Sequence, residues 1–155
     1  MIVTFCGHRD VFQSDDVRAW LVDCVEKLIQ EGATDFYLGG YGSFDGIAAS
    51  VVWKLKEKYP DICSVLVIPY LNRNIDTSRY DLTTYPPLET VPKRYAIVRR
   101  NQWMVQTADV VVAYVRHSWG GAAATLEYAK RKKKRIILYD DKICSKRTIA
   151  DLPTT

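Results

Sequence analysis

The sequence of 155 residues lacks most of the features that place a protein outside the ordinary globular classes. No apolar run approaches the roughly 20 residues that a membrane-spanning helix needs. The apolar run at residues 2–6 has neither the basic leader nor the length of a signal peptide. The four cysteines form no CxxC pair, which favours reduced thiols over a disulfide framework. We therefore expect a cytoplasmic protein without membrane association.

Positive charge is in small excess, and the common motifs of metal sites, P-loop proteins and α/β-hydrolases are missing. The formal net charge of +4 is too mild to indicate a nucleic-acid partner, but it is compatible with a small anionic ligand. The two histidines, His8 and His117, offer no HxxH or HExxH spacing, so we expect no metal site and no cofactor. Neither GxxxxGKS/T nor GxSxG occurs, which argues against a P-loop kinase or ATPase and against an α/β-hydrolase.

What the chain does have is a regular alternation of strand and helix patterns. Apolar residues make up 48% and charged residues 26%, as in an ordinary globular domain. Short apolar runs predict strands at residues 2–6, 35–38, 65–68, 109–115 and 135–139. Apolar residues at helical spacing predict helices at residues 14–31, 43–59, 93–107 and 120–132.

This alternation predicts the fold class, because strands separated by helices form a parallel sheet covered on both faces. We predict a single domain over residues 1–155, with a core of about residues 1–140 and a short C-terminal tail. Its architecture is α/β, a Rossmann-like three-layer α/β/α arrangement. The predicted sheet has five strands, is mostly parallel and has the order 3-2-1-4-5.

One polar segment, residues 70–92, interrupts the pattern with a loop of about 20 residues. Loops of this length are uncommon in compact domains and are often functional. We expect this loop to cover the ligand site or a partner subunit, the alternative being a mobile surface excursion. The side chains that give it aromatic, amide and cationic reach are Tyr70, Asn72, Arg73, Arg79, Tyr80 and Tyr85.

Three loops converge where the predicted strand order reverses, the position at which such sheets bind ligands. They lie at residues 6–9, 39–45 and 118–121, and each places glycine beside polar or aromatic residues. Two of them lead into helix N-termini, whose N–H groups and partial positive charge attract phosphate. A single strand-to-helix turn needs glycine for structural reasons alone, whereas two at neighbouring strand ends favour an anion site.

Four segments occur in an order that resembles a known superfamily. They are CGHR at residues 6–9, GGYGSFD at 39–45, RNQWMV at 100–105 and GGAAATLEYA at 120–129. Together they resemble the SLOG superfamily, close to its YpsA-like (DUF1273) branch, to about residue 139. The resemblance implies a Rossmann-like fold and a nucleotide-like ligand at the glycine turns. The superfamily includes sensors of nucleotide-derived signals and, more distantly, the LOG or "lysine decarboxylase"-like phosphoribohydrolases.

The glycine turns and the resemblance together define a set of predicted ligand-binding residues. This set is Gly7, His8, Arg9, Gly39, Gly40, Tyr41, Gly42, Phe44, Asp45, Arg100, Asn101, Ser118, Trp119, Gly120, Gly121, Thr125 and Glu127. LOG enzymes carry PGGxGTxxE, and this chain keeps the two glycines and the glutamate of that motif. It departs from the motif at Trp119, Ala123 and Ala124, which replace Pro, the third Gly and Thr.

Several of these residues have a structural interpretation beside the functional one. Asp45 is either a helix-terminal carboxylate or a partner for a ribose hydroxyl. Glu127 either pairs with Arg131 one turn later or faces a ribose, as its LOG counterpart does. Tyr41, Phe44 and Trp119 either stack on a base or pack internally. The basic run at residues 130–135 is interpreted as a solvated helix end rather than a nucleic-acid groove.

The favoured function is the binding of a nucleotide or nucleotide-derived small molecule, as a sensor, carrier or sequestering protein. The alternative is a hydrolase of N-glycosidic bonds, acting on a nucleoside monophosphate or an NAD-like substrate, with Glu127 and Asp45 as its carboxylates. A third hypothesis is an interaction module with a vestigial pocket. We expect a homo-oligomer, a dimer or larger, and no nucleic-acid partner.

Overall fold

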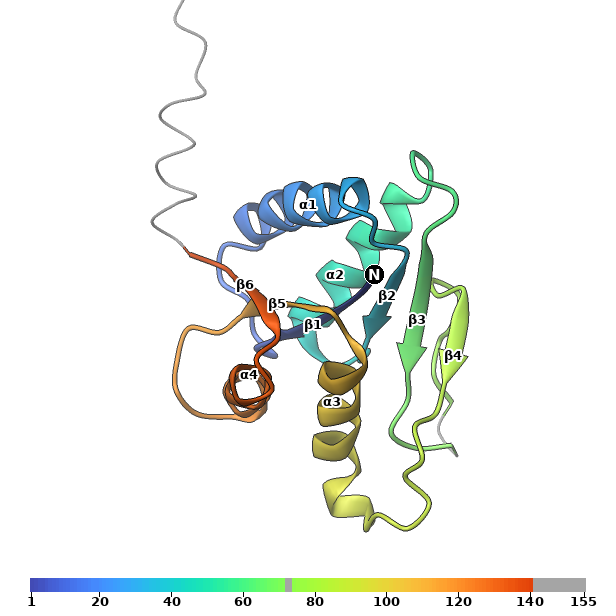
Figure 1. The fold of residues 1–155 in the computed structure, drawn as a ribbon, viewed down its shortest axis with the longest axis vertical. Helices are drawn as coiled ribbons and strands as arrows, with labels where there is room; N and C mark the ends of the chain where they lie inside the picture. The colour runs from blue at the N-terminus through green and yellow to red at the C-terminus, as the bar shows by residue number, and fades with distance from the viewer. Residues whose placement is uncertain (72–73, 141–155) are drawn as a thin grey trace, which may run out of the picture.

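The fold is a parallel sheet with helices on both faces (Figure 1). The computed structural model describes residues 1–71 and 74–140. The strands are β1 (Ile2–Gly7), β2 (Asp35–Leu38), β3 (Cys63–Val67), β4 (Leu82–Thr84), β5 (Val110–Tyr114) and β6 (Arg135–Leu138). The helices are α1 (Ser14–Gln30), α2 (Gly42–Leu55), the 3₁₀ turn η1 (Lys93–Tyr95), α3 (Ala96–Thr107) and α4 (Gly121–Arg131).

The sheet has the order β4-β3-β2-β1-β5-β6, and every neighbouring pair is parallel. The predicted class, a Rossmann-like α/β fold with a parallel sheet, is confirmed. The predicted count of five strands is wrong, because the sheet formed by the described residues has six. Its full order therefore differs from 3-2-1-4-5: the five predicted strands keep their relative positions, and β4 is added outside β3.

The strand that the sequence did not reveal, β4, lies within the segment predicted as a loop. Leu82 pairs with Val65 of β3, and Asp81, the residue before Leu82, makes further contacts with β3 and with the C-terminal end of α2. The Asp81 carboxylate accepts a hydrogen bond from the Ser64 N–H at 2.8 Å and forms an ion pair with Lys56. A strand of three exposed or half-exposed residues at a sheet edge has no apolar run and no alternation, so its sequence is indistinguishable from that of a polar loop.

Alternate residues of β1 face two different layers. Val3 and Phe5 point to the larger core, which the buried sides of α1 and α2 complete. Cys6 points to the opposite face, where it packs with Val105 of α3 and Leu126 of α4 in a smaller cluster. A cavity lies on this side of β1, bordered by α3 and α4.

Three expectations concern the loop, the tail and membrane association. None of the described residues of 70–92 lines the cavity beside β1; Tyr70 and Tyr85 instead border a second hollow of about 570 Å³. Asn72, Arg73 and the predicted C-terminal tail lie outside the described residues. The described helices include none with the length and apolar character needed to cross a membrane.

Candidate functional site

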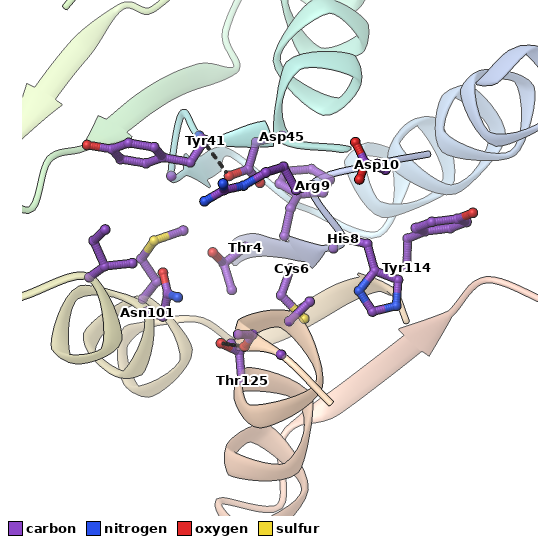
Figure 2. A pocket seen from close by; sticks show the side chains of 18 of the residues that line it. Thr4, Cys6, His8, Arg9, Asp10, Tyr41, Asp45, Asn101, Tyr114 and Thr125 are labelled. Carbon is purple, nitrogen blue, oxygen red and sulfur yellow. Dashed lines mark hydrogen bonds between the residues drawn. The ribbon is translucent and has the colours of Figure 1, made fainter. Parts of the chain in front are cut away.

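A cavity of about 500 Å³ opens at the carboxyl end of the sheet, over β1 (Figure 2). Thr4 and Cys6 of β1 point into it, and Asn101 of α3 and Thr125 of α4 border it from two sides. The strand order reverses at this place, because β1 connects through α1 to β2 while β5 pairs with its other edge. The cavity therefore occupies the position at which open parallel sheets bind ligands.

Most of the predicted site residues come together in this cavity. They enter from the loops after β1, β2 and β5 and from the facing sides of α3 and α4. The predicted residues that line it are Gly7, His8, Arg9, Gly39, Tyr41, Asp45, Arg100, Asn101, Trp119, Gly120, Gly121 and Thr125.

The remaining predicted residues do not line the cavity: Gly40, Gly42, Phe44, Ser118 and Glu127. Phe44 is fully buried in the larger core and stacks on the Tyr114 ring, with 5.8 Å between centroids. The Glu127 side chain is 65% exposed and pairs with Lys130 at 3.1 Å. Phe44 therefore packs internally, and Glu127 pairs one helical turn away, with Lys130 rather than Arg131.

Several lining residues were absent from the prediction. Thr4 and Cys6 of β1 point toward the cavity. Because side chains alternate along a strand, both lie on the face of the sheet that α3 and α4 cover. Met104 adds an apolar wall from α3. His117 and Phe12 carried no sequence signal, because each lies in an irregular loop whose path the sequence does not specify.

Asp45 places a buried carboxyl group at the wall of the cavity. It is 9% exposed, and its Oδ2 atom accepts a hydrogen bond from the Tyr41 N–H at 3.1 Å (Figure 2). Burial raises the pKa of Asp45 to about 6, against the opposing effects of the Tyr41 hydrogen bond and the Arg100 charge. The group therefore changes its charge close to neutral pH, which is a property common among functional carboxyls.

Arg100 is only 2% exposed and acts as an internal tie. Its Nη1 atom donates to the carbonyl oxygens of Gly39 at 2.7 Å and Val67 at 2.9 Å, at the carboxyl ends of β2 and β3. Its Nε atom donates to Asn101 Oδ1 at 2.9 Å, and its guanidinium lies 5.2 Å from the centre of the Tyr41 ring. These contacts join α3 to two strand ends, a positioning role that the predicted ligand contact did not include.

Three rings form a stack at the mouth of the cavity, which we call the ring column. The His8 and His117 rings lie 3.8 Å apart between centroids at 12°, and the His117 and Trp119 rings lie 3.8 Å apart at 18°. His8 Nε2 accepts a hydrogen bond from the Arg116 N–H at 2.8 Å, and the His8 ring meets the Tyr114 ring edge-on. The ring column thus links the loop after β1 to the loop after β5.

The first turn of α4 supplies an electropositive wall. Gly120 precedes the helix at a φ of +92°, a conformation that L side chains rarely adopt. The first N–H groups of a helix lack intrahelical acceptors and carry a partial positive charge. Arg9 and Arg116, in the loops after β1 and β5, also line the cavity, as does the carboxylate of Asp10. This wall suits an anionic group with further hydrogen-bonding atoms.

No family model and no curated protein matches the sequence. Solved structures with a similar fold do exist. DNA processing protein A from Helicobacter pylori, described for its binding of single-stranded DNA, has a TM-score of 0.64 at 15% identity, over 97% of this chain and 72% of that chain. The molybdenum cofactor binding protein from Rippkaea orientalis has a TM-score of 0.62 at 19% identity, over 96% of this chain and 82% of that one.

A third similar structure is the molybdenum cofactor carrier protein from Chlamydomonas reinhardtii, with a TM-score of 0.58 at 17% identity, over 97% of this chain and 84% of that one. At these identities the likeness extends to the fold alone. The chain is therefore a Rossmann-like α/β protein.

Proposed function

We propose that this protein binds a nucleotide or nucleotide-derived small molecule in the cavity over β1, as a sensor, carrier or sequestering protein. The observation that carries the proposal is the composition of the cavity wall. The N-terminus of α4 borders one side, Arg9 lies on the other side beside the buried carboxyl of Asp45 (Figure 2), and the loop after β5 adds Arg116 and the stack of rings. A phosphate, a ribose hydroxyl and a base need these three kinds of contact.

The size of the cavity and the similar solved structures both support the binding of a small-molecule ligand. About 500 Å³ lies within the range of small-molecule sites and accommodates one nucleotide. Two of the similar structures are a binding protein and a carrier protein of the molybdenum cofactor, which is a small molecule. DNA processing protein A binds single-stranded DNA, but a net charge of +4 and a cavity of one-nucleotide size favour a small molecule here.

The hydrolase alternative has less support from the geometry. It needs two carboxyl groups beside the scissile bond. Asp45 lines the cavity, whereas Glu127 is exposed and lies outside the lining. Membership of the YpsA-like branch remains part of the proposal on the sequence segments alone. Assembly into a homo-oligomer remains part of it because related folds commonly form dimers.

The test begins with mass spectrometry of ligands retained by the purified protein, followed by a thermal-shift screen of nucleotides. A ligand at 100 times its dissociation constant adds about 2.7 kcal/mol to the free energy of unfolding. Gly121→Asp is expected to abolish the binding of an identified phosphate ligand in calorimetry, because a carboxylate at this helix start repels the anion. The backbone has room for the new side chain, since no atom lies within 4 Å of a Cβ placed at Gly121.

Gly46→Asp provides a matched control on α2, since a Cβ at Gly46 is equally free and the residue does not line the cavity. This variant should bind like the unaltered protein. Unchanged affinity of Gly121→Asp for a phosphate ligand would contradict the proposal. Release of a free base from AMP or NAD by the unaltered protein would favour the hydrolase instead.

A further inference from the structure

Trp119 is the outermost ring of the ring column, and no other ring among the described residues stacks on its outer face. Trp119 is 68% exposed and Phe12 is 70% exposed, and no other large apolar side chain among the described residues is as exposed as these two. Both line the same cavity. Exposed aromatic side chains gathered at one hollow are typical of a binding site, whereas scattered ones carry no such meaning.

Contacts beneath it hold the Trp119 ring in place. His117 covers one face of the indole, and His8 covers the far face of His117. His8 is itself held by the hydrogen bond from the Arg116 N–H to its Nε2 atom and by the backbone bond from its own N–H to the Tyr114 carbonyl at 3.2 Å. The indole is thus oriented from β1 and β5, so little side-chain entropy remains to be lost when a ligand binds.

One atom of the ring column has no partner of its own. His117 Nδ1 is buried and makes no hydrogen bond within the described part of the chain. A buried ring nitrogen without a partner is costly, and the stacking contacts with His8 and Trp119 offset that cost by packing both faces of the His117 ring. The contacts between rings therefore hold the end of the column beside the N-terminus of α4, which begins two residues after Trp119.

We propose that the planar ring of the ligand stacks on the outer face of Trp119. The ligand ring would then be the fourth ring of the ring column. The inference rests on the proposed function and names the ligand class more closely: a planar heteroaromatic phosphate, purine or pterin. The phosphate of such a ligand lies toward the first turn of α4, because Gly120 and Gly121 directly follow Trp119. Trp119 is then a residue that selects ligands with a ring over ring-free sugar phosphates.

The experiment compares three probes by calorimetry: AMP, neopterin monophosphate and ribose 5-phosphate, which has no heterocycle. Stacking of a base on an aromatic side chain contributes about 1–3 kcal/mol, so Trp119→Ala should weaken the binding of a ringed probe about 5- to 150-fold. The same variant should leave the affinity for ribose 5-phosphate unchanged. Trp119→Phe should restore most of the lost affinity, because it keeps an aromatic face.

Trp53→Ala on α2 is the matched control, since Trp53 is partly exposed and does not line the cavity. It should bind all three probes as the unaltered protein does. The inference is overturned if Trp119→Ala binds the ringed probes normally while Gly121→Asp has lost them; the proposed function then stands. It is equally overturned if the unaltered protein binds neither ringed probe more tightly than ribose 5-phosphate. The proposed function fails separately if the protein retains no ligand and no nucleotide raises its melting temperature.

Discussion

Replacing Asp45 by Asn is expected to stabilise the folded protein above neutral pH, because the buried carboxylate destabilises it there. The pKa of Asp45 rises on folding from 3.8 to about 6, chiefly through burial. At about 1.4 kcal/mol for each pH unit, this difference corresponds to about 3 kcal/mol. Asn has the same shape and keeps an oxygen that accepts the Tyr41 N–H, so the variant removes the charge and little else.

The pH dependence has a definite sign. Between pH 3.8 and about 6 the folded state holds a proton on Asp45 that the unfolded state has already released. The free energy of unfolding contributed by this group therefore falls as the pH rises through that range, and it stays low above it. The advantage of Asp45→Asn should be near zero at pH 4, grow up to pH 6 and remain constant at pH 8.

Urea unfolding at pH 4, 5, 6, 7 and 8 measures this difference between the two proteins. Glu127→Gln is the control, since it makes the same chemical change on an exposed carboxylate and should alter stability by less than about 0.5 kcal/mol at every pH. If Asp45→Asn is less stable than the unaltered protein at pH 8, the attraction between Asp45 and Arg100 outweighs the effect of burial, and the reasoning is refuted.

Two further predictions concern the same region. Gly7→Ala should destabilise the fold by about 1–3 kcal/mol in urea unfolding, because its Cβ would lie 2.2 Å from the Phe44 ring; Gly46→Ala, with open space around it, should be neutral or stabilising, and equal effects at both glycines would contradict this. Burial, followed by the charges of His117 and Arg116, lowers the pKa of His8 below 6.5, so the unfolded state takes up the proton first as the pH falls. The unaltered protein should therefore lose stability relative to His8→Gln between pH 7 and pH 5, and a constant difference over that range would count against the ring column as described.

The fold was predictable where the sequence shows a period. Buried strands such as β5 form continuous apolar runs, and the helices between them place apolar residues on one face, so alternation alone indicates the class. β4 was not predictable, because Leu82, Thr83 and Thr84 bury too little to leave a pattern. Their pairing with β3 and the hydrogen bond from the Ser64 N–H to Asp81 are tertiary contacts, which have no signature in the local sequence.

The sequence predicts which loops form the site, but not which of their side chains face the cavity. The rule that ligands bind at the reversal of strand order is enough to bring together Arg9, Tyr41 and Trp119, which lie in three separate loops. It could not tell that Phe44, three residues after Tyr41, turns into the core, because that depends on the rotation of α2 about its axis. The exposed position of Glu127 on α4 depends on the rotation of that helix in the same way.

Two unfavourable features meet at the cavity over β1, and their coincidence is the strongest argument that it is a working site. A carboxyl group is buried at Asp45 at a cost in stability, and an indole is left in water at Trp119. Neither feature follows from the fold. A neutral residue in place of Asp45 and a polar residue in place of Trp119 would make a Rossmann-like domain more stable and more soluble. Where local rules of stability are broken together at one cavity, function is the usual reason. If Asp45→Asn gains stability and loses affinity for a phosphate ligand, the buried charge is retained for binding; a gain in stability without any loss of affinity would place the function of this protein elsewhere.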